Sequence, residues 1–277
     1  MSIVILLFII LTLALQLAWH NAGWLLLIPW GLLSLLVIFL EEEARRFKHE
    51  SENKDTFVSI AAHQIRNPLT GIKWALDLLQ RGKLNALEAA DLIKKTYDQN
   101  ERLILLVSDL LNVSRISAGR FVYHLTPTNL ATLWNDVEQT LRLPLDQKKL
   151  LLVRHLINLP PLIIDHEKIA LALQNLLDNA IKYTPAGQQI DVAFLRHPDS
   201  VEIQLRDRGM GIPADQQKDI GARFFRARNA QRSGQAGTGL GLYLTKKIIE
   251  HHGGRLWFES VENLGTTFHV SLPLNSK

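Results

Sequence analysis

The sequence predicts a multidomain protein with an N-terminal α-helical membrane hairpin, an α-helical hairpin that forms a dimeric four-helix bundle, and a C-terminal α+β sandwich. Three observations support this fold class. No Lys, Arg, Asp or Glu occurs between Ile3 and Leu40. Apolar residues then follow a heptad spacing to about residue 117. From Phe121 onward, segments with alternating apolar residues are interspersed with segments of helical periodicity.

The charge-free stretch is long enough for two membrane spans. One span takes ~20 apolar residues, so residues 3–19 and 24–40 fit two helices joined by a short turn. Trp19 and Trp24 flank the turn, as expected at a membrane interface. A cleavable signal peptide needs a basic start, and no basic residue precedes the apolar stretch. We expect residues 1–40 to be two transmembrane helices of a multi-pass inner (plasma) membrane protein in contact with membrane lipid, with its later domains cytoplasmic.

A helical linker and a helical hairpin are expected next. Residues 41–55 are mostly charged, but the heptad spacing begins within them, which predicts a helical signalling linker. Residues 56–120 contain two amphipathic segments. The first helix should bend near Pro68 and end about Gly82, and the second should cover Ala86–Ser117. Since one hairpin cannot bury so broad an apolar face alone, we expect a homodimer.

The remaining residues, 121–277, are expected to form the α+β sandwich, with helices over one sheet face. Alternating apolar residues predict strands, and a period of 3.6 predicts helices. The predicted strands are 150–155, 190–196, 201–206, 254–260 and 266–272, and the predicted helices are 130–147, 166–182 and 240–251.

Composition excludes several classes of function. The net charge is +4, from 31 basic and 27 acidic residues, which gives no reason to expect nucleic acid as a partner. Cysteine is absent, which excludes disulfides, thiolate nucleophiles and cysteine-ligated metals.

One histidine of the first helix has a setting that favours chemistry. The heptad register directs His63 away from the bundle core, and Asn67 lies one turn further on the same side. An exposed helical histidine alone is usually only a solvated side chain. The run around it, FVSIAAHQIRNPLTGI at 57–72, resembles the phospho-acceptor box of the sensor histidine kinases of two-component systems (HisKA type). A neutral imidazole nitrogen is a competent nucleophile toward phosphorus near neutral pH.

Four later segments resemble, in order and spacing, the boxes of that family's GHKL (HATPase_c, Bergerat-fold) ATP-binding domain. LQNLLDNAIKYT (173–184) resembles the N-box, and RDRGMGIP (206–213) resembles the D-x-G-x-G box. Phe224-Phe225-Arg226 resembles the F-box, and AGTGLGLYL (236–244) the second glycine box. The polar stretch between these last two has the composition of a mobile lid. Each segment alone also fits an ordinary helix, turn or loop.

The resemblance implies ATP and Mg²⁺ as cofactors and a role for each matched residue. His63 would be the phosphorylated nucleophile, with Gln64 and Asn67 as further catalytic residues. Asn175 and Asn179 would hold Mg²⁺ and phosphate oxygens. The other nucleotide-binding residues would be Lys182, Tyr183, Asp207, which would accept a hydrogen bond from the adenine amino group, Gly209, Gly211, Ile212, Phe225, Arg226, Gly237, Thr238, Gly239, Leu240, Gly241 and Leu242.

The resemblance covers about residues 56–273 and implies a protein-histidine kinase. Such an enzyme phosphorylates its own histidine and passes the phosphoryl group to an aspartate in the receiver domain of a separate response regulator. Asn67 matches the family's phosphatase-linked polar residue, so a regulator phosphatase activity is also expected. Because the loop between the predicted spans is short, sensing is expected within the bilayer, through a partner membrane protein or in the cytoplasm.

The chain departs from the family pattern at Gln64, where the family has an acidic residue that orients the imidazole and accepts its proton. Glutamine accepts a hydrogen bond but gives no charge assistance. This leaves open an ATP-binding pseudokinase that serves as a two-component scaffold. A GHKL ATPase of the chaperone or DNA-repair kind shares the nucleotide boxes, but it lacks both an acceptor histidine on a dimer helix and a membrane hairpin.

Overall fold

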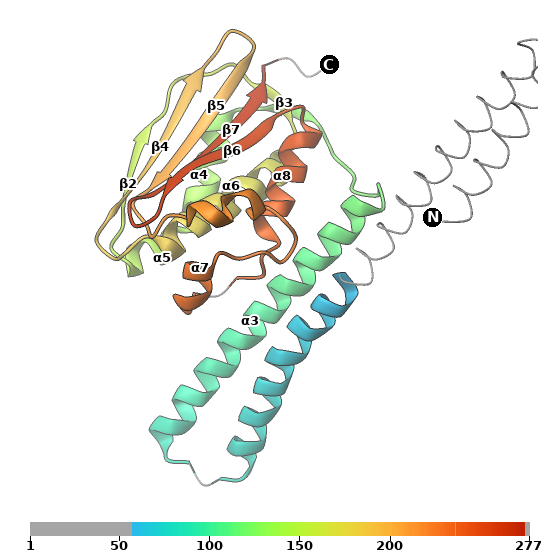
Figure 1. Ribbon diagram of the computed structural model, residues 1–277, viewed down its shortest axis with the longest axis vertical. Coiled ribbons are helices and arrows are strands. Elements are labelled where there is room, and N and C mark those ends of the chain that lie inside the picture. Colours follow the sequence, from blue (N-terminus) through green and yellow to red (C-terminus); the bar gives the residue numbers. More distant parts are fainter. Residues whose placement is uncertain (1–56, 83, 236, 275–277) are drawn as a thin grey trace, which may run out of the picture. The chain divides into compact units, whose positions relative to one another are not determined.

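The computed structural model describes residues 57–82, 84–235 and 237–274. The chain divides into two compact units, Met1–Ser59 and Ile60–Lys277, and nearly all described residues belong to the second. That unit contains a helical hairpin followed by a sheet with helices on it (Figure 1).

In the hairpin, the second helix has the predicted bounds and the first ends close to the predicted end, while the predicted start of the first lies outside the described residues. Its first helix covers residues 57–80 and continues through Pro68, and its second is α3 (Ala86–Ser117). The two helices pack closely, because a Cβ atom on Gly71 would overlap the Gln99 side chain.

A capping box starts α3. The Asn85 side chain accepts a hydrogen bond from the backbone N–H of Glu88 at 2.9 Å, and the Glu88 carboxylate accepts one from the backbone N–H of Asn85 at 3.0 Å. These bonds satisfy two donors that a helix start or its preceding turn would otherwise leave unpaired. The chain therefore re-enters the helix directly after the short loop.

The main sheet has five strands in the order β2-β4-β5-β7-β6. Only the β2–β4 pair is parallel. The strands are β2 (Leu151–His155), β4 (Gln189–Arg196), β5 (Ser200–Asp207), β6 (Arg255–Val261) and β7 (Gly265–Pro273), and a separate small sheet pairs β1 (Thr126–Thr128) with β3 (Leu162–Ile164).

Helices cover one face of the main sheet (Figure 1). They are α4 (Leu130–Thr140), α5 (Arg142–Gln147), α6 (His166–Tyr183) and α8 (Gly241–His251); η2 (Ala214–Asp219) and α7 (Arg228–Arg232) lie in the connection between β5 and α8. The five predicted strands and the helices at α6 and α8 are confirmed. The single helix predicted at 130–147 is wrong: it breaks at Leu141, because the Pro144 ring cannot be accommodated beside the carbonyl of Thr140 in a continuous helix.

The core lies between the sheet and these helices. Burial alternates along β4 and β5, so that Phe194 and Ile203 point inward, and α6 contributes Leu173, Leu176 and Leu177. Each such side chain contributes roughly 1.5–3 kcal/mol when it is fully buried. The core therefore fixes the position of α6 against the sheet.

The predicted membrane location is corrected here. Among the described residues, no helix is long and apolar enough to cross a bilayer. The 32 residues of α3 exceed the needed length, but charged side chains such as Asp91, Lys94 and Lys95 recur along it. The two predicted spans lie outside the described residues. The prediction of an inner (plasma) membrane location is therefore withdrawn.

Truncation of a core leucine of α4 tests the packing. Leu133 is fully buried, and we expect Leu133→Ala to lower the free energy of unfolding by about 3 kcal/mol, because it leaves a cavity. Leu143→Ala is the matched control, since Leu143 is 68% exposed and should change stability by less than about 0.5 kcal/mol. Urea unfolding measures both; equal losses would contradict the described core.

Candidate functional site

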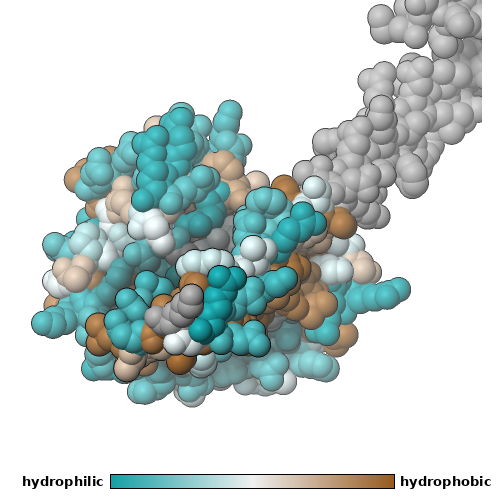
Figure 2. Space-filling model, turned by 90° about the horizontal axis from the view of Figure 1, so that it is seen from below, coloured by the Kyte–Doolittle hydropathy of each residue, from teal (hydrophilic) through white to brown (hydrophobic). Residues whose placement is uncertain are grey.

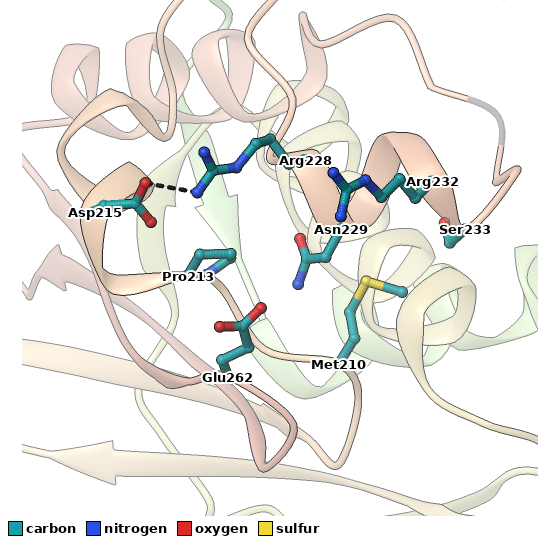
Figure 3. A pocket seen from close by; sticks show the side chains of 8 residues that line it. All are labelled: Met210, Pro213, Asp215, Arg228, Asn229, Arg232, Ser233 and Glu262. Atoms are coloured by element: carbon teal, nitrogen blue, oxygen red, sulfur yellow. Dashed lines mark hydrogen bonds and ion pairs between the residues drawn. The ribbon is translucent and has the colours of Figure 1, made fainter.

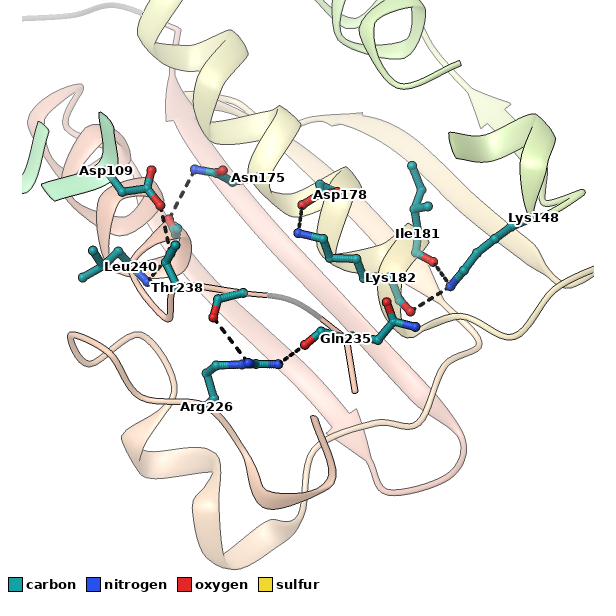
Figure 4. Close-up of polar contacts among 12 residues, drawn as sticks. Asp109, Lys148, Asn175, Asp178, Ile181, Lys182, Arg226, Gln235, Thr238 and Leu240 are labelled. Atoms are coloured by element: carbon teal, nitrogen blue, oxygen red, sulfur yellow. Dashed lines mark hydrogen bonds and ion pairs between the residues drawn. The ribbon is translucent and has the colours of Figure 1, made fainter. Parts of the chain in front are cut away.

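Helix α6 carries the predicted N-box on the side that faces away from its buried leucines. Asn175 and Asn179 are half-buried there, one turn apart. The Asn175 amide nitrogen donates to the carbonyl of Gly241 at 3.4 Å (Figure 4). It also donates to the hydroxyl of Thr245 at 3.5 Å. The side-chain oxygens of both asparagines receive no hydrogen bond from the described residues, so both remain available to a ligand.

The last turn of α6 carries two more predicted residues, Lys182 and Tyr183. Lys182 forms an ion pair with Asp178, one turn before it (Figure 4). Its charge is therefore already shared before any phosphate arrives. Tyr183 is half-buried at the end of the helix.

Asp207 ends β5 and is 6% exposed. Its Oδ1 atom accepts hydrogen bonds from the backbone N–H groups of Gly209 at 2.8 Å and Thr266 at 3.2 Å, whereas Oδ2 receives none from the described residues. Burial raises the pKa of Asp207 to about 6, although the two backbone donors act in the opposite direction. Oδ2 is not among the fully buried side-chain atoms without a partner, so it is open to solvent and can accept a hydrogen bond from a ligand N–H group.

The loop after Asp207 contains Gly209, Gly211 and Ile212. A Cβ atom on Gly209 would lie 2.6 Å from the carbonyl oxygen of Tyr183, so the loop packs directly against the end of α6. The backbone N–H of Ile212 donates to the Ser260 hydroxyl at 2.9 Å. These contacts attach the loop to both α6 and β6.

The second glycine box, with Gly237, Thr238, Gly239 and Leu240, leads into α8, which begins at Gly241 and continues with Leu242. Gly239 has a φ of +73°, and a Cβ atom there would lie 2.6 Å from the Phe224 backbone. No side chain caps α8, so its first N–H groups remain available to an anion.

The Thr238 hydroxyl joins this box to α3. It accepts a hydrogen bond from the backbone N–H of Leu240 at 3.2 Å and donates one to the Asp109 carboxylate at 2.8 Å. Burial raises the pKa of Asp109, against the lowering effects of this bond and of the Lys182 charge. Asp109 is a contact of the site that sequence reasoning missed.

Arg226 binds the backbone of the predicted lid. Its guanidinium donates to the carbonyls of Gln235 at 2.6 Å and Gly237 at 3.3 Å (Figure 4). It also donates to the carbonyl of Ala230 at 3.1 Å. Its Nε atom is buried without a partner. The preceding Phe225 is half-buried. Arg226 therefore holds together the segment between α7 and α8.

A pocket of about 560 Å³ lies beside these loops (Figure 3). None of the predicted site residues lines it. Arg228 on its rim pairs with Asp215 at 2.7 Å, and Asn229 donates to the carbonyl of Gly211 at 2.9 Å. The lining residues are Met210, Pro213, Asp215, Arg228, Asn229, Arg232, Ser233 and Glu262.

The predicted acceptor residues lie on the exposed surface of the first hairpin helix. The Asn67 amide nitrogen is 3.5 Å from the Nδ1 atom of His63. Gln64 is also exposed. The structure thus brings His63 and Asn67 into contact, as their spacing of four residues predicts.

Two matched family models account for most of the described chain. A model described as Histidine kinase-, DNA gyrase B-, and HSP90-like ATPase matches residues 164–276, which contain α6, α8 and the strands β4 to β7. A model of the His Kinase A (phospho-acceptor) domain matches residues 53–119, which contain the hairpin. The chain belongs to the sensor histidine kinases.

Individual relatives agree with this assignment. The adaptive-response sensory kinase SasA of Synechococcus sp. (strain JA-3-3Ab) is 32% identical over 243 residues, which cover 86% of this chain and 64% of the relative. The chain thus spans somewhat less than two thirds of that protein. The histidine kinase ThkA, solved in complex with response regulator protein TrrA, is 26% identical with a TM-score of 0.67, covering 86% of this chain and 66% of that chain. The Acinetobacter baumannii histidine kinase AdeS is similar in fold, at 24% identity and a TM-score of 0.63, over 77% of this chain and 98% of that chain.

Stability and nucleotide affinity should respond oppositely to Asp207→Asn. Because the folded-state pKa is raised from 3.8 to about 6, the stability that Asp207 contributes is fully present below pH 4 and is lost as the pH rises through 6. At pH 8 the ionised Asp207 lowers the free energy of unfolding by on the order of 3 kcal/mol, since one pKa unit equals about 1.4 kcal/mol. An asparagine at this position does not ionise, so the variant does not lose this stability as the pH rises.

We therefore expect Asp207→Asn to gain stability over the wild type between pH 4 and 7, while losing at least about 10-fold in ATP affinity because the free acceptor is gone. Urea unfolding across this pH range and calorimetry with ATP measure the two effects. A stability difference that is independent of pH would refute the buried-carboxylate account.

Proposed function

We propose that this chain is a protein-histidine kinase that moves the γ-phosphoryl group of ATP to His63 and then to an aspartate of a separate response regulator. One observation carries the proposal. The same chain has an exposed histidine in an acceptor box and, in its ATPase-like domain, a buried carboxylate with one oxygen free for an adenine amino group.

The described groups around Asp207 suit a purine nucleotide. The Oδ2 atom of Asp207 would accept from the adenine amino group, with Ile212 and Tyr183 beside the base. The glycine loop before α8 and the first N–H groups of that helix would bind the phosphates. Arg226, which now binds lid carbonyls, has a buried unpaired Nε atom, and this favours a rearrangement of the lid when ATP binds.

The donor set also suits Mg²⁺. The unpaired side-chain oxygens of Asn175 and Asn179 are hard ligands, and Mg²⁺ usually binds through few protein groups and the phosphates of its substrate. In the described part of the chain, no cluster of three His, Cys, Asp or Glu side chains is placed to hold a metal ion on its own. The ion would neutralise phosphate charge during transfer.

Transfer of the γ-phosphoryl group to His63 forms one bond and breaks one. The Nε2 atom of a neutral imidazole forms a bond to the γ-phosphorus, the bond from that phosphorus to the bridging oxygen breaks, and ADP leaves. The ring, which is exposed, then releases the proton on Nδ1 to solvent water. Gln64 can accept a hydrogen bond from this N–H group but cannot take its proton. The amide of Asn67 lies within reach of Nδ1, and its oxygen can orient the ring once the amide turns.

A homodimer is part of the proposal. In the single chain, α3 exposes hydrophobic side chains in the predicted heptad register, and brown hydrophobic areas are visible at the surface in Figure 2. These exposed residues are Ile93, Tyr97, Ile104, Val107 and Leu111. A second hairpin would cover them as a four-helix bundle. The complex of ThkA with its regulator supports a response regulator as the second partner.

Gln64 favours a second candidate function, an ATP-binding pseudokinase that serves as a scaffold. A neutral side chain beside the acceptor histidine removes the charge assistance that the family's acidic residue supplies. A scaffold would bind ATP at Asp207 without labelling His63. Incubation with γ-labelled ATP separates the two functions.

Replacement of the acceptor gives the direct test of the kinase. His63→Ala should bind ATP normally but incorporate no acid-labile phosphate, because the nucleophile is absent. The control is His155→Ala, which removes an exposed histidine of β2 and should label like the wild type. Persistent labelling of the His63 variant would assign the phosphate elsewhere, and an unlabelled wild type would favour the scaffold.

Gln64→Glu should accelerate the reaction. A carboxylate makes a charge-assisted hydrogen bond to the ring and stabilises the charge that develops on it. A difference of about 1–3 kcal/mol in the transition state corresponds to roughly 5- to 150-fold in rate. We expect at least a several-fold gain in single-turnover labelling at saturating ATP, with little change in ATP affinity. Equal or slower labelling would mean that this position does not limit catalysis.

A further inference from the structure

The end of α6 is held by a lysine from another part of the chain. Lys148 follows α5, and its ammonium group donates to the carbonyls of Ile181 at 2.7 Å and Lys182 at 2.8 Å (Figure 4). It also donates to the carbonyl of Thr184 at 3.2 Å. The last carbonyls of a helix have no partner within the helix, and a cation there also complements the helix dipole. All three N–H donors of the ammonium group are thus used.

The surroundings of Lys148 show that it serves the backbone and not a carboxylate. None of the described acidic side chains forms an ion pair with it, and burial lowers its pKa. Its own carbonyl accepts a hydrogen bond from the backbone N–H of Gly187 at 3.0 Å. Lys148 therefore ties down both the last turn of α6 and the loop that follows it.

The turn that Lys148 holds is in direct contact with the candidate nucleotide site. The carbonyl oxygen of Tyr183, in the turn that Lys148 holds, is so close to Gly209 that a Cβ atom would lie 2.6 Å away. The backbone N–H of Gly209 in turn donates to Asp207 at 2.8 Å. A shift of the last turn of α6 would thus move the glycine loop and the carboxylate with it.

We propose that Lys148 is a positioning residue for nucleotide binding, which fixes the last turn of α6 so that Tyr183, Gly209 and Asp207 keep the geometry that the base requires. The inference rests on the proposed ATP site. Lys148 touches the backbone behind that site, and it acts on the nucleotide only through the groups it holds. Small displacements of the groups that position a ligand can weaken its binding many-fold.

The test compares Lys148→Met with Lys149→Met in the full chain. Lys149 is the adjacent, exposed lysine, so the same chemical change is made one residue away from the carbonyls. We expect the Kd for Mg·ATP to rise about 10-fold in Lys148→Met and to stay within about twofold in Lys149→Met. The rate of His63 labelling at saturating ATP should change less than twofold, because the bound nucleotide restores the geometry.

Further variants separate positioning from general loss of stability. Leu133→Ala removes a core side chain and should destabilise the fold while leaving the Kd for Mg·ATP unchanged, whereas Lys148→Gln, which retains two donors, should show an intermediate rise of about threefold. An unchanged Kd in the folded Lys148 variants, or an equal rise in Leu133→Ala, would overturn the proposal. Failure of the wild type to bind ATP would instead refute the proposed function and this inference with it.

Discussion

The position of α6 is the constraint on which the rest of the structure depends. One face of this helix is buried in the core through Leu173, Leu176 and Leu177, and the other presents Asn175 and Asn179 to the candidate site. The side chains that stabilise the domain thus also set the place of the predicted ligands. Lys148 completes this arrangement by holding the end of the helix, where burial alone leaves carbonyls unpaired.

Asp207 shows how a residue of the candidate site reduces the stability of the fold. A carboxylate that is 6% exposed and has a pKa of about 6 destabilises the folded domain near neutral pH. An apolar residue there would pack without this penalty. Oδ2 receives no hydrogen bond from the described residues, so in the proposed function the adenine amino group would supply one. Destabilising features of this kind are expected at functional sites.

Periodicity predicted most of the fold, because the hairpin and the central sheet each bury one regular face. The bounds of α3 and the five main strands follow from it. The short strands β1 and β3 hold too few residues for a period to appear, and the helix break before Pro144 needed the local rule for proline. The predicted membrane location was corrected because no described helix is able to cross a bilayer, and the two predicted spans themselves lie outside the described residues.

Motifs predicted the residues of the candidate site but not the contacts that support them. Lys148, Asp109 and Thr266 act on groups at least thirty residues away in the sequence, and no local pattern marks such pairs. Arg226 was predicted to bind the nucleotide, and in the structure its guanidinium donates to carbonyls of the lid. Long-range hydrogen bonds of this kind depend on the packed fold, which the sequence alone does not display.

Hydrogen exchange with and without Mg·ATP tests the central claim most directly, namely that the nucleotide binds between α6, the loop after β5 and the start of α8. Amides of residues 179–183, 207–212 and 237–242 should become protected by ATP, while β2 remains unchanged. Protection confined to the pocket of Figure 3, or no protection after Asp207, would contradict the account.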